Sequence, residues 1–108
     1  MNKYLVLYRA PIPAEDQMAN ATPEQRQAGM DAWMAWAAKA GSALVDFGAP
    51  LGPSSTLGGK PQSDFVGGYS IIQADSLPHA EKVLEGHPHL DQPGFSIDVL
   101  EQLPMPGM

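Results

Sequence analysis

The feature that most constrains the fold is a short segment near the start of the chain that is apolar on both of its faces. Between Lys3 and Arg9, every residue is Tyr, Leu or Val. Successive side chains of a strand point to opposite faces, so neither face of an extended 3–9 segment suits contact with water. The segment therefore predicts an interior strand of a sheet that is covered on both sides.

A helix is predicted next, because several start signals coincide in Thr22-Pro-Glu-Gln25. Thr is a favoured N-cap, Pro suits the first helical position, Glu complements the helix dipole, and Gln completes a capping box. The helix can run to Ala40, where Gly41 is a typical stop. Gly29 within it suggests close packing against a neighbour. Its apolar face comprises Met30, Trp33, Met34 and Ala37, widened by Trp36.

Three further strands and a second helix follow from the apolar patterns. We expect strands at 43–47, 69–74 and 95–99, with Leu44 and Asp46 on one face of the first of these. Residues 14–21 are interpreted as a loop or a short helical turn. Residues 48–68 form a long Gly- and Pro-rich connection. Asp75 or Ser76 caps a second helix of nearly three turns, which Gly86 ends.

The predicted order β-α-β-β-α-β indicates an α+β protein with the ferredoxin-like plait, in which both helices cover one face of a four-stranded antiparallel sheet. The 108 residues suit a single domain, 1–108, and residues 103–108 form a proline-blocked tail. The second face of the sheet remains apolar and uncovered. A homodimer that packs two such faces together, as a dimeric α+β barrel, would bury it.

Charge and composition exclude several functional classes. The net charge of −6 disfavours nucleic acid and anionic lipid as partners, and there is no cysteine for a disulfide, a thiol nucleophile or a Cys-based zinc site. RNA-recognition domains share the β-α-β-β-α-β order along the chain. The basic-aromatic string that would mark such a domain is missing from the third predicted strand of this sequence, which argues against RNA as a partner. No stretch has the length of a signal-peptide core or a membrane span, so we expect a cytoplasmic protein.

Five strings, in this order and spacing, resemble the YCII-related family. They are Lys3-Tyr-Leu-Val-Leu-Tyr-Arg9, Thr22-Pro-Glu-Gln25, Gly48-Ala-Pro-Leu-Gly-Pro53, Gly67-Gly-Tyr-Ser-Ile-Ile72 and Gly86-His-Pro-His-Leu90. The resemblance spans nearly the whole chain and implies the same dimeric α+β barrel, with a small-molecule pocket between helices and sheet in each protomer. Some members of the wider superfamily catalyse proton transfer, in isomerisation or elimination.

The resemblance also implies where an acid-base pair would lie. In the founding branch of the family a His on the first helix and an Asp just after the second helix are the proposed pair. The His position falls on or beside Met30, with Asp31 next to it, and the Asp position falls at or near His87. Another branch carries Asp-Gly-Pro-Phe before the Gly-Gly-Tyr strand, where this chain has Gln62-Ser-Asp-Phe-Val66. The chain therefore departs from both patterns.

The densest group of potential proton-transfer residues is His87, His89 and Asp91, just after the second helix. Imidazoles suit general acid or base catalysis at neutral pH. The alternative is structural, because a His past a helix C-terminus caps carbonyls and interacts with the dipole. His79 is interpreted as a solvated residue. His-x-His-x-Asp lacks a fourth ligand, so neither a metal site nor a cofactor is predicted.

Two other sets of residues complete the candidate site. Asp46, in an apolar strand, requires a partner or water; Arg9 is a candidate partner, and a solvent-facing Asp is the alternative to a catalytic one. Met30, Trp33 and Met34 could line a pocket for an aromatic ligand, or pack in the core. Two hypotheses follow: a homodimer that binds a small organic molecule of apolar or aromatic character and catalyses proton transfer with His87 or His89, or a non-enzymatic binding or interaction module.

Overall fold

The computed structural model describes residues 1–106 and confirms the α+β class. One four-stranded antiparallel sheet in the order β2-β3-β1-β4 is compatible with a ferredoxin-like fold. The strands are β1 (Asn2–Ala10), β2 (Leu44–Pro50), β3 (Phe65–Ala74) and β4 (Ser96–Glu101). The helices are α1 (Ala14–Asn20), α2 (Pro23–Ala40) and α3 (Leu77–Val83), with the 3-10 turns η1 (Gly41–Ala43) and η2 (Pro88–Asp91). Of the predicted 103–108 tail, residues 107–108 lie outside the described part.

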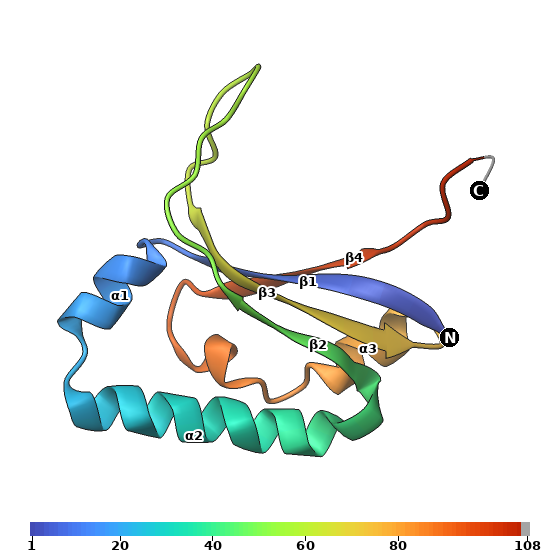
Figure 1. Cartoon of the computed structure of the whole chain (residues 1–108), viewed down its shortest axis with the longest axis horizontal. Coiled ribbons are helices and arrows are strands. Elements are labelled where there is room, and N and C mark those ends of the chain that lie inside the picture. Colours follow the sequence, from blue (N-terminus) through green and yellow to red (C-terminus); the bar gives the residue numbers. More distant parts are fainter. Residues whose placement is uncertain (107–108) are drawn as a thin grey trace.

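The strand predicted from the apolar 3–9 segment, β1, lies in the interior of the sheet between β3 and β4. Tyr4 lies opposite Ile72, and Val6 lies opposite Ser70 on one side and Val99 on the other. These residues share the face that packs against the helices. The odd-numbered residues of β1 point to the opposite face, which none of the helices in the described part of the chain covers (Figure 1).

The start of α2 is as the sequence predicts. The Thr22 hydroxyl accepts a hydrogen bond from the Gln25 backbone N–H at 3.1 Å, and the Gln25 side chain accepts one from the Thr22 N–H at 2.9 Å. This capping box satisfies two backbone donors that the helix itself leaves free. The helix ends at Ala40, and the N–H of Gly41 returns to the carbonyl of Ala37.

In β2 the structure corrects the predicted alternation. The register with β3 shifts between Leu44 and Asp46, so Leu44 pairs with Ile72 on the helix-facing side whereas Asp46 pairs with Ile71 on the other. A bulge of this kind inserts an extra residue and reverses which face the following side chains occupy. The prediction that Leu44 and Asp46 share a face was therefore wrong.

A second irregularity in β2 requires glycine. Gly48 has a φ of 82°, and a Cβ there would lie 1.7 Å from the Tyr69 carbonyl oxygen. Only glycine accepts both this conformation and this approach. The Gly48 N–H donates to the Asp46 carboxylate at 2.9 Å, so the Asp46 side chain stabilises the irregular backbone of β2 next to it.

Other element boundaries also differ from the predictions. The long connection is shorter than expected, because β2 continues to Pro50 and β3 begins at Phe65. Of the two alternatives for 14–21, the helical one is confirmed, since residues 14–20 form α1. By contrast, α3 has 7 residues, about two turns instead of nearly three, and η2 was not predicted. Ser76, rather than Asp75, caps α3 by accepting from the His79 N–H.

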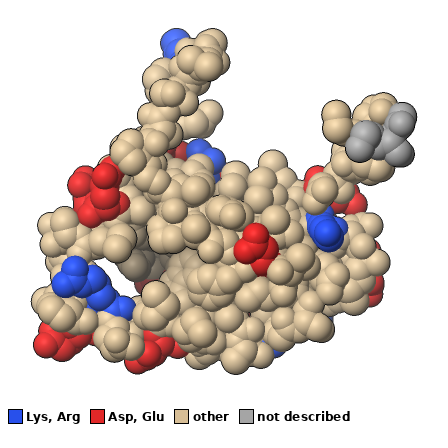
Figure 2. Space-filling model, in the orientation of Figure 1, with Lys and Arg blue, Asp and Glu red and all other residues tan. Residues whose placement is uncertain are grey.

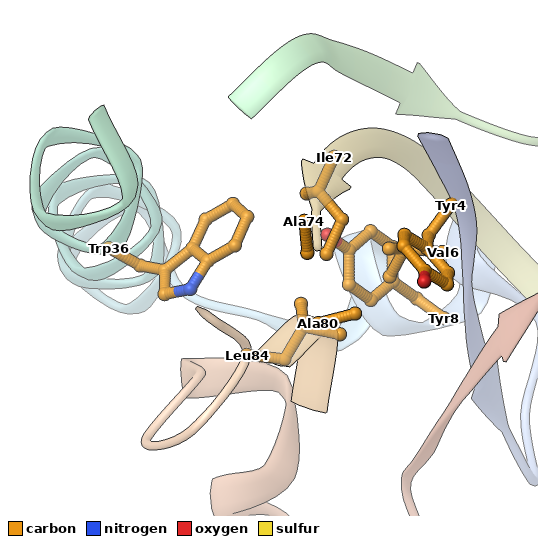
Figure 3. Close-up of a cluster of buried hydrophobic side chains, with 8 residues drawn as sticks. All are labelled: Tyr4, Val6, Tyr8, Trp36, Ile72, Ala74, Ala80 and Leu84. Atoms are coloured by element: carbon orange, nitrogen blue, oxygen red, sulfur yellow. The ribbon is translucent and has the colours of Figure 1, made fainter. Parts of the chain in front are cut away.

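The core lies between the helices and the sheet. Figure 3 shows the Trp36 side chain extending from α2 toward residues of β1, β3 and α3. The cluster comprises Tyr4, Val6, Tyr8, Trp36, Ile72, Ala74, Ala80 and Leu84, all at most 4% exposed. The Trp36 indole N–H also donates to the Val83 carbonyl at 3.1 Å, which joins α2 to α3. The core therefore anchors the C-terminal half of α2.

Within residues 1–106, no helix lies on the outer face of the sheet, and two extended segments project from this side. Residues 51–64 and 102–106 both leave the body of the molecule in Figure 1. Leu5 and Leu100 pair on this face and are 37% and 47% exposed. No helix within residues 1–106 has the length and apolar character needed to span a membrane.

Candidate functional site

A cavity of about 520 Å³ opens between the first two helices and the sheet. It corresponds in Figure 2 to the hollow between α1, the start of α2 and the strands above them. Its lining comprises Tyr8, Ala14, Gln17, Met18, Arg26, Gly29, Met30, Trp33, Phe47, Ala49, Pro50, Gly67, Gly68, Tyr69 and His89. The volume is in the usual range for sites that enclose a small organic molecule.

One stripe of α2 forms the lower wall of this cavity. Arg26, Gly29, Met30 and Trp33 all line it, and their spacing of three, four and seven residues places them on one side of the helix. A Cβ added at Gly29 would meet nothing within 4 Å. The expectation that Gly29 marks close packing was wrong, since this glycine instead widens the cavity.

Aromatic rings form the inner wall. The Tyr8 ring from β1 meets the Trp33 ring edge-on, with centroids 4.7 Å apart, and Trp33 is 6.3 Å from the Phe47 ring of β2. Edge-to-face pairs at such distances are favourable and hold both rings in place. The wall is therefore a preformed apolar surface.

The Tyr8 hydroxyl is held by a hydrogen bond inside the protein. It lies 2.8 Å from the Ser70 hydroxyl, and Ser70 in turn donates to the Phe47 carbonyl at 2.7 Å. Because the Ser70 proton goes to that carbonyl, Tyr8 must be the donor in its bond to Ser70. Burial raises the pKa of Tyr8, an effect that the Ser70 hydrogen bond partly opposes. This hydroxyl is a poor base at neutral pH.

Of the two predicted histidines, His89 lines the cavity. Its Nε2 lies 2.9 Å from the Arg9 carbonyl oxygen, and because that oxygen only accepts, Nε2 carries the proton. Burial lowers the pKa of His89, while hydrogen bonding with the backbone of Arg9 and Ser96 opposes the shift. The ring is thus oriented by β1, and it faces Tyr8 at 5.3 Å between centroids.

His87 lies behind the cavity wall and is fully buried. Its ring packs against Trp33, Trp36 and Tyr8, with centroids 4.5, 4.4 and 5.0 Å away. Burial, with a smaller contribution from nearby His89, lowers the pKa of His87 to about 4, so the ring is neutral at pH 7.

The two ring nitrogens of His87 differ, because one accepts a hydrogen bond from the backbone and the other is buried without a partner in the described part of the chain. Nδ1 accepts the His89 backbone N–H at 3.0 Å, which leaves the proton of the neutral ring on Nε2. Nε2 has no hydrogen-bond partner among residues 1–106. His87 therefore orients the η2 turn that carries His89, and it joins the cavity wall to the core.

The structure separates the other predicted polar residues from this cavity. Arg9 points to the outer face, where its guanidinium binds Asp64 at 2.6 Å and Asp98 at 3.3 Å. The predicted pairing of Arg9 with Asp46 is wrong, because the bulged β2 engages Asp46 with Gly48. The Arg9 guanidinium donates a hydrogen bond to the Asp64 carboxylate, and this bond lowers the pKa of Asp64.

The remaining candidate residues also fall into two groups, those that line the cavity and those that lie outside it. Met30 and Trp33 line the cavity, whereas Met34 is 55% exposed and does not. His79 lies at the start of α3, with its side chain 43% exposed and within 3.9 Å of Asp75. In the part of the chain that is described, no three His, Asp or Glu side chains gather closely enough to hold a metal ion.

Several lining residues were not among the sequence candidates, although one signal was available. Arg26 and Gly29 precede Met30 and Trp33 on the same helical face, so extending the periodicity toward the N-terminus would have added both. Tyr8, Phe47 and Tyr69 could not be found in this way. They come from three different strands, and only the register of the sheet brings them together.

No protein-family model matches the chain, and no curated protein is similar enough to it to indicate a relationship.

Proposed function

We propose that this protein binds a small organic molecule with an apolar or aromatic body in the cavity between α1, α2 and the sheet, as part of a YCII-like cytoplasmic homodimer. The cavity carries the proposal. It is lined mainly by aromatic rings, methionines and glycines, and its few polar side chains come from different elements. Ligand sites in proteins combine an apolar lining with a small number of polar groups in this way.

Filling the cavity tests the proposal. Gly29→Leu would extend a side chain into the cavity, since a Cβ at this position meets no neighbouring atom within 4 Å, so binding of a neutral probe, 2-naphthalenemethanol, should weaken at least about tenfold by calorimetry. The matched control is Ala38→Leu at an exposed position on the same helix. Equal affinities of the two variants would contradict the assignment of the cavity as the binding site.

Proton transfer is the second candidate function, and the position of His89 on the cavity wall favours it. A neutral imidazole next to a bound molecule is suited to act as a base. The bonds of His87 and His89 to the backbone favour an orienting role instead. If His89 is the base, His89→Gln should lower turnover about 100-fold or more, while His79→Gln should leave it unchanged.

The homodimer and the complete barrel are proposed from the bare outer face of the sheet. Apolar side chains on this face remain partly exposed, and a second copy could bury them. We expect a particle of twice 11.5 kDa in sedimentation at micromolar concentration. Leu100→Lys should dissociate it, whereas Leu77→Lys, at the similarly exposed start of α3, should not. A monomeric wild-type protein would contradict the barrel.

A further inference from the structure

We infer that the ligand is an aromatic monocarboxylate, whose ring lies against Trp33 and whose carboxylate is bound by Arg26 at the mouth of the cavity. This inference rests on the proposed binding function and specifies the chemical class of the ligand. It follows from the charge of the lining, from the partners of Arg26 and from its position on α2.

The lining carries one permanent charge, and it is positive. The chain has twelve Asp and Glu against six Lys and Arg, yet none of the acidic side chains within residues 1–106 lines the cavity, whereas Arg26 does. The other titratable groups that the described part of the chain contributes to the wall are Tyr8, Tyr69 and His89. The pKa shifts of Tyr8 and His89 both favour their neutral forms at pH 7. A chain of net negative charge thus presents a cation to this cavity.

Within residues 1–106, the structure shows no ion pair or side-chain hydrogen bond for Arg26. Arg9, by contrast, is held by Asp64 and Asp98. Arg26 also lies in the first turns of α2, where the positive end of the helix dipole disfavours a cation. Neither an ion pair nor the helix dipole accounts for an arginine at this position, whereas an anionic ligand would.

The geometry fits a molecule with an anionic end and an aromatic end. Arg26 and Trp33 are separated by seven residues of α2, or about 10 Å along the helix axis. A guanidinium binds a carboxylate through two parallel hydrogen bonds, while the rings of Trp33, Tyr8 and Phe47 offer an apolar surface on the wall of the same cavity. A single arginine balances one negative charge, and the acidic protein as a whole repels ligands with more.

Three probes with the same bicyclic body test the inference in the full-length protein. They are 2-naphthoate, 2-naphthalenemethanol and 2-naphthylmethylamine, which are anionic, neutral and cationic at pH 7. We expect calorimetry to show the tightest binding for the carboxylate and the weakest for the amine. The order should become less pronounced as salt is added, because the guanidinium is exposed to solvent.

Variants of Arg26 separate its charge from the rest of the cavity. Arg26→Gln should weaken binding of 2-naphthoate about tenfold or more, with binding of the alcohol changed less than about twofold. Arg26→Glu should favour the amine over the carboxylate. Lys39→Gln removes the same charge from the far end of α2, outside the cavity, and should preserve the wild-type order. Arg26 is exposed, so these substitutions leave the core intact.

The outcomes distinguish this inference from the proposed function. Equal affinities of the wild type for carboxylate and alcohol would overturn the inference and leave the binding function standing. An equal loss of affinity for the carboxylate and the alcohol in Arg26→Gln would have the same two consequences. Failure of all three probes to bind would overturn the binding function, and the inference with it.

Discussion

The two ends of the layer between α2 and the sheet differ sharply. At the C-terminal end of α2, Trp36 is 4% exposed and packs against buried residues of β1, β3 and α3. At the N-terminal end, Met30 is 56% exposed, Gly29 faces open space, and the helix forms one wall of a cavity. One helix thus serves two purposes along its length.

The difference shows how a small protein can keep a preformed cavity without losing its core. Packing at the closed end supplies the stabilisation, because most of the fully buried apolar side chains cluster there. The open end needs only a wall that is held in place, and the ring contacts of His87 to both Trp33 and Trp36 provide a link between the two ends. If the two ends are energetically unequal, substitutions at the closed end cost far more stability than substitutions at the open end.

The largest effect is expected at the closed end. Trp36→Ala should lower the free energy of unfolding by about 3–5 kcal/mol, because it leaves a void in the core and removes the hydrogen bond to the Val83 carbonyl. Met34→Ala, on the same helix but 55% exposed, should change it by less than about 0.5 kcal/mol. Chemical denaturation measures both. Similar losses in the two variants would contradict the contrast.

His87, whose ring contacts both Trp33 and Trp36, should make the stability of the protein depend on pH. The pKa of His87 is about 4 in the folded protein and near 6.5 when unfolded, so the unfolded chain binds the proton more readily between these values. The contribution of the neutral His87 ring to the free energy of unfolding is complete above pH 6.5, and the free energy falls by roughly 3 kcal/mol as the pH decreases toward 4. His89 shifts in the same direction and adds to the trend.

The matched variants for this dependence are His87→Gln and His79→Gln. Denaturation midpoints measured from pH 7 to pH 4 should fall less steeply in His87→Gln than in the wild type, while His79→Gln retains the wild-type slope. An identical slope in His87→Gln would show that the ring is accessible to protons in the folded state.

A smaller effect is expected where α2 begins. Thr22→Ala should cost about 1 kcal/mol, because the Gln25 N–H loses its side-chain acceptor at the helix start. Affinity for a ligand should be unchanged well below the melting temperature. Denaturation of Thr22→Ser, which keeps the hydroxyl, serves as the control, and a loss of the same size there would argue against the cap.

The smallest effect should be of opposite sign, at the open end. Gly29→Ala should raise the free energy of unfolding by about 0.5–1 kcal/mol, because the alanine restricts the unfolded chain and its methyl group enters empty space. Thermal denaturation detects this as a small increase in melting temperature. A decrease would mean that the cavity wall at Gly29 is more closely packed than the structure indicates.

Local signals predicted much of the fold. The capping box of α2 and its end at Gly41 depend on residues a few positions apart, and the interior position of β1 follows from its own apolar residues. The β2 strand was predicted less well, because its bulges depend on pairing with β3. Asp46 and Arg9 were misassigned as partners for this reason: each points where the register directs it, and no local pattern reveals that register.

The sequence by itself determined the class of fold, the course of α2 and the choice of His89, Met30 and Trp33 as candidate site residues, because helix caps and side-chain periodicity act over short distances. Only the tertiary structure decided that Arg26, Tyr8 and Phe47 share one cavity and that His87 stands behind its wall. Those relations depend on how strands far apart in the chain align, and alignment is set by the packing of the whole layer.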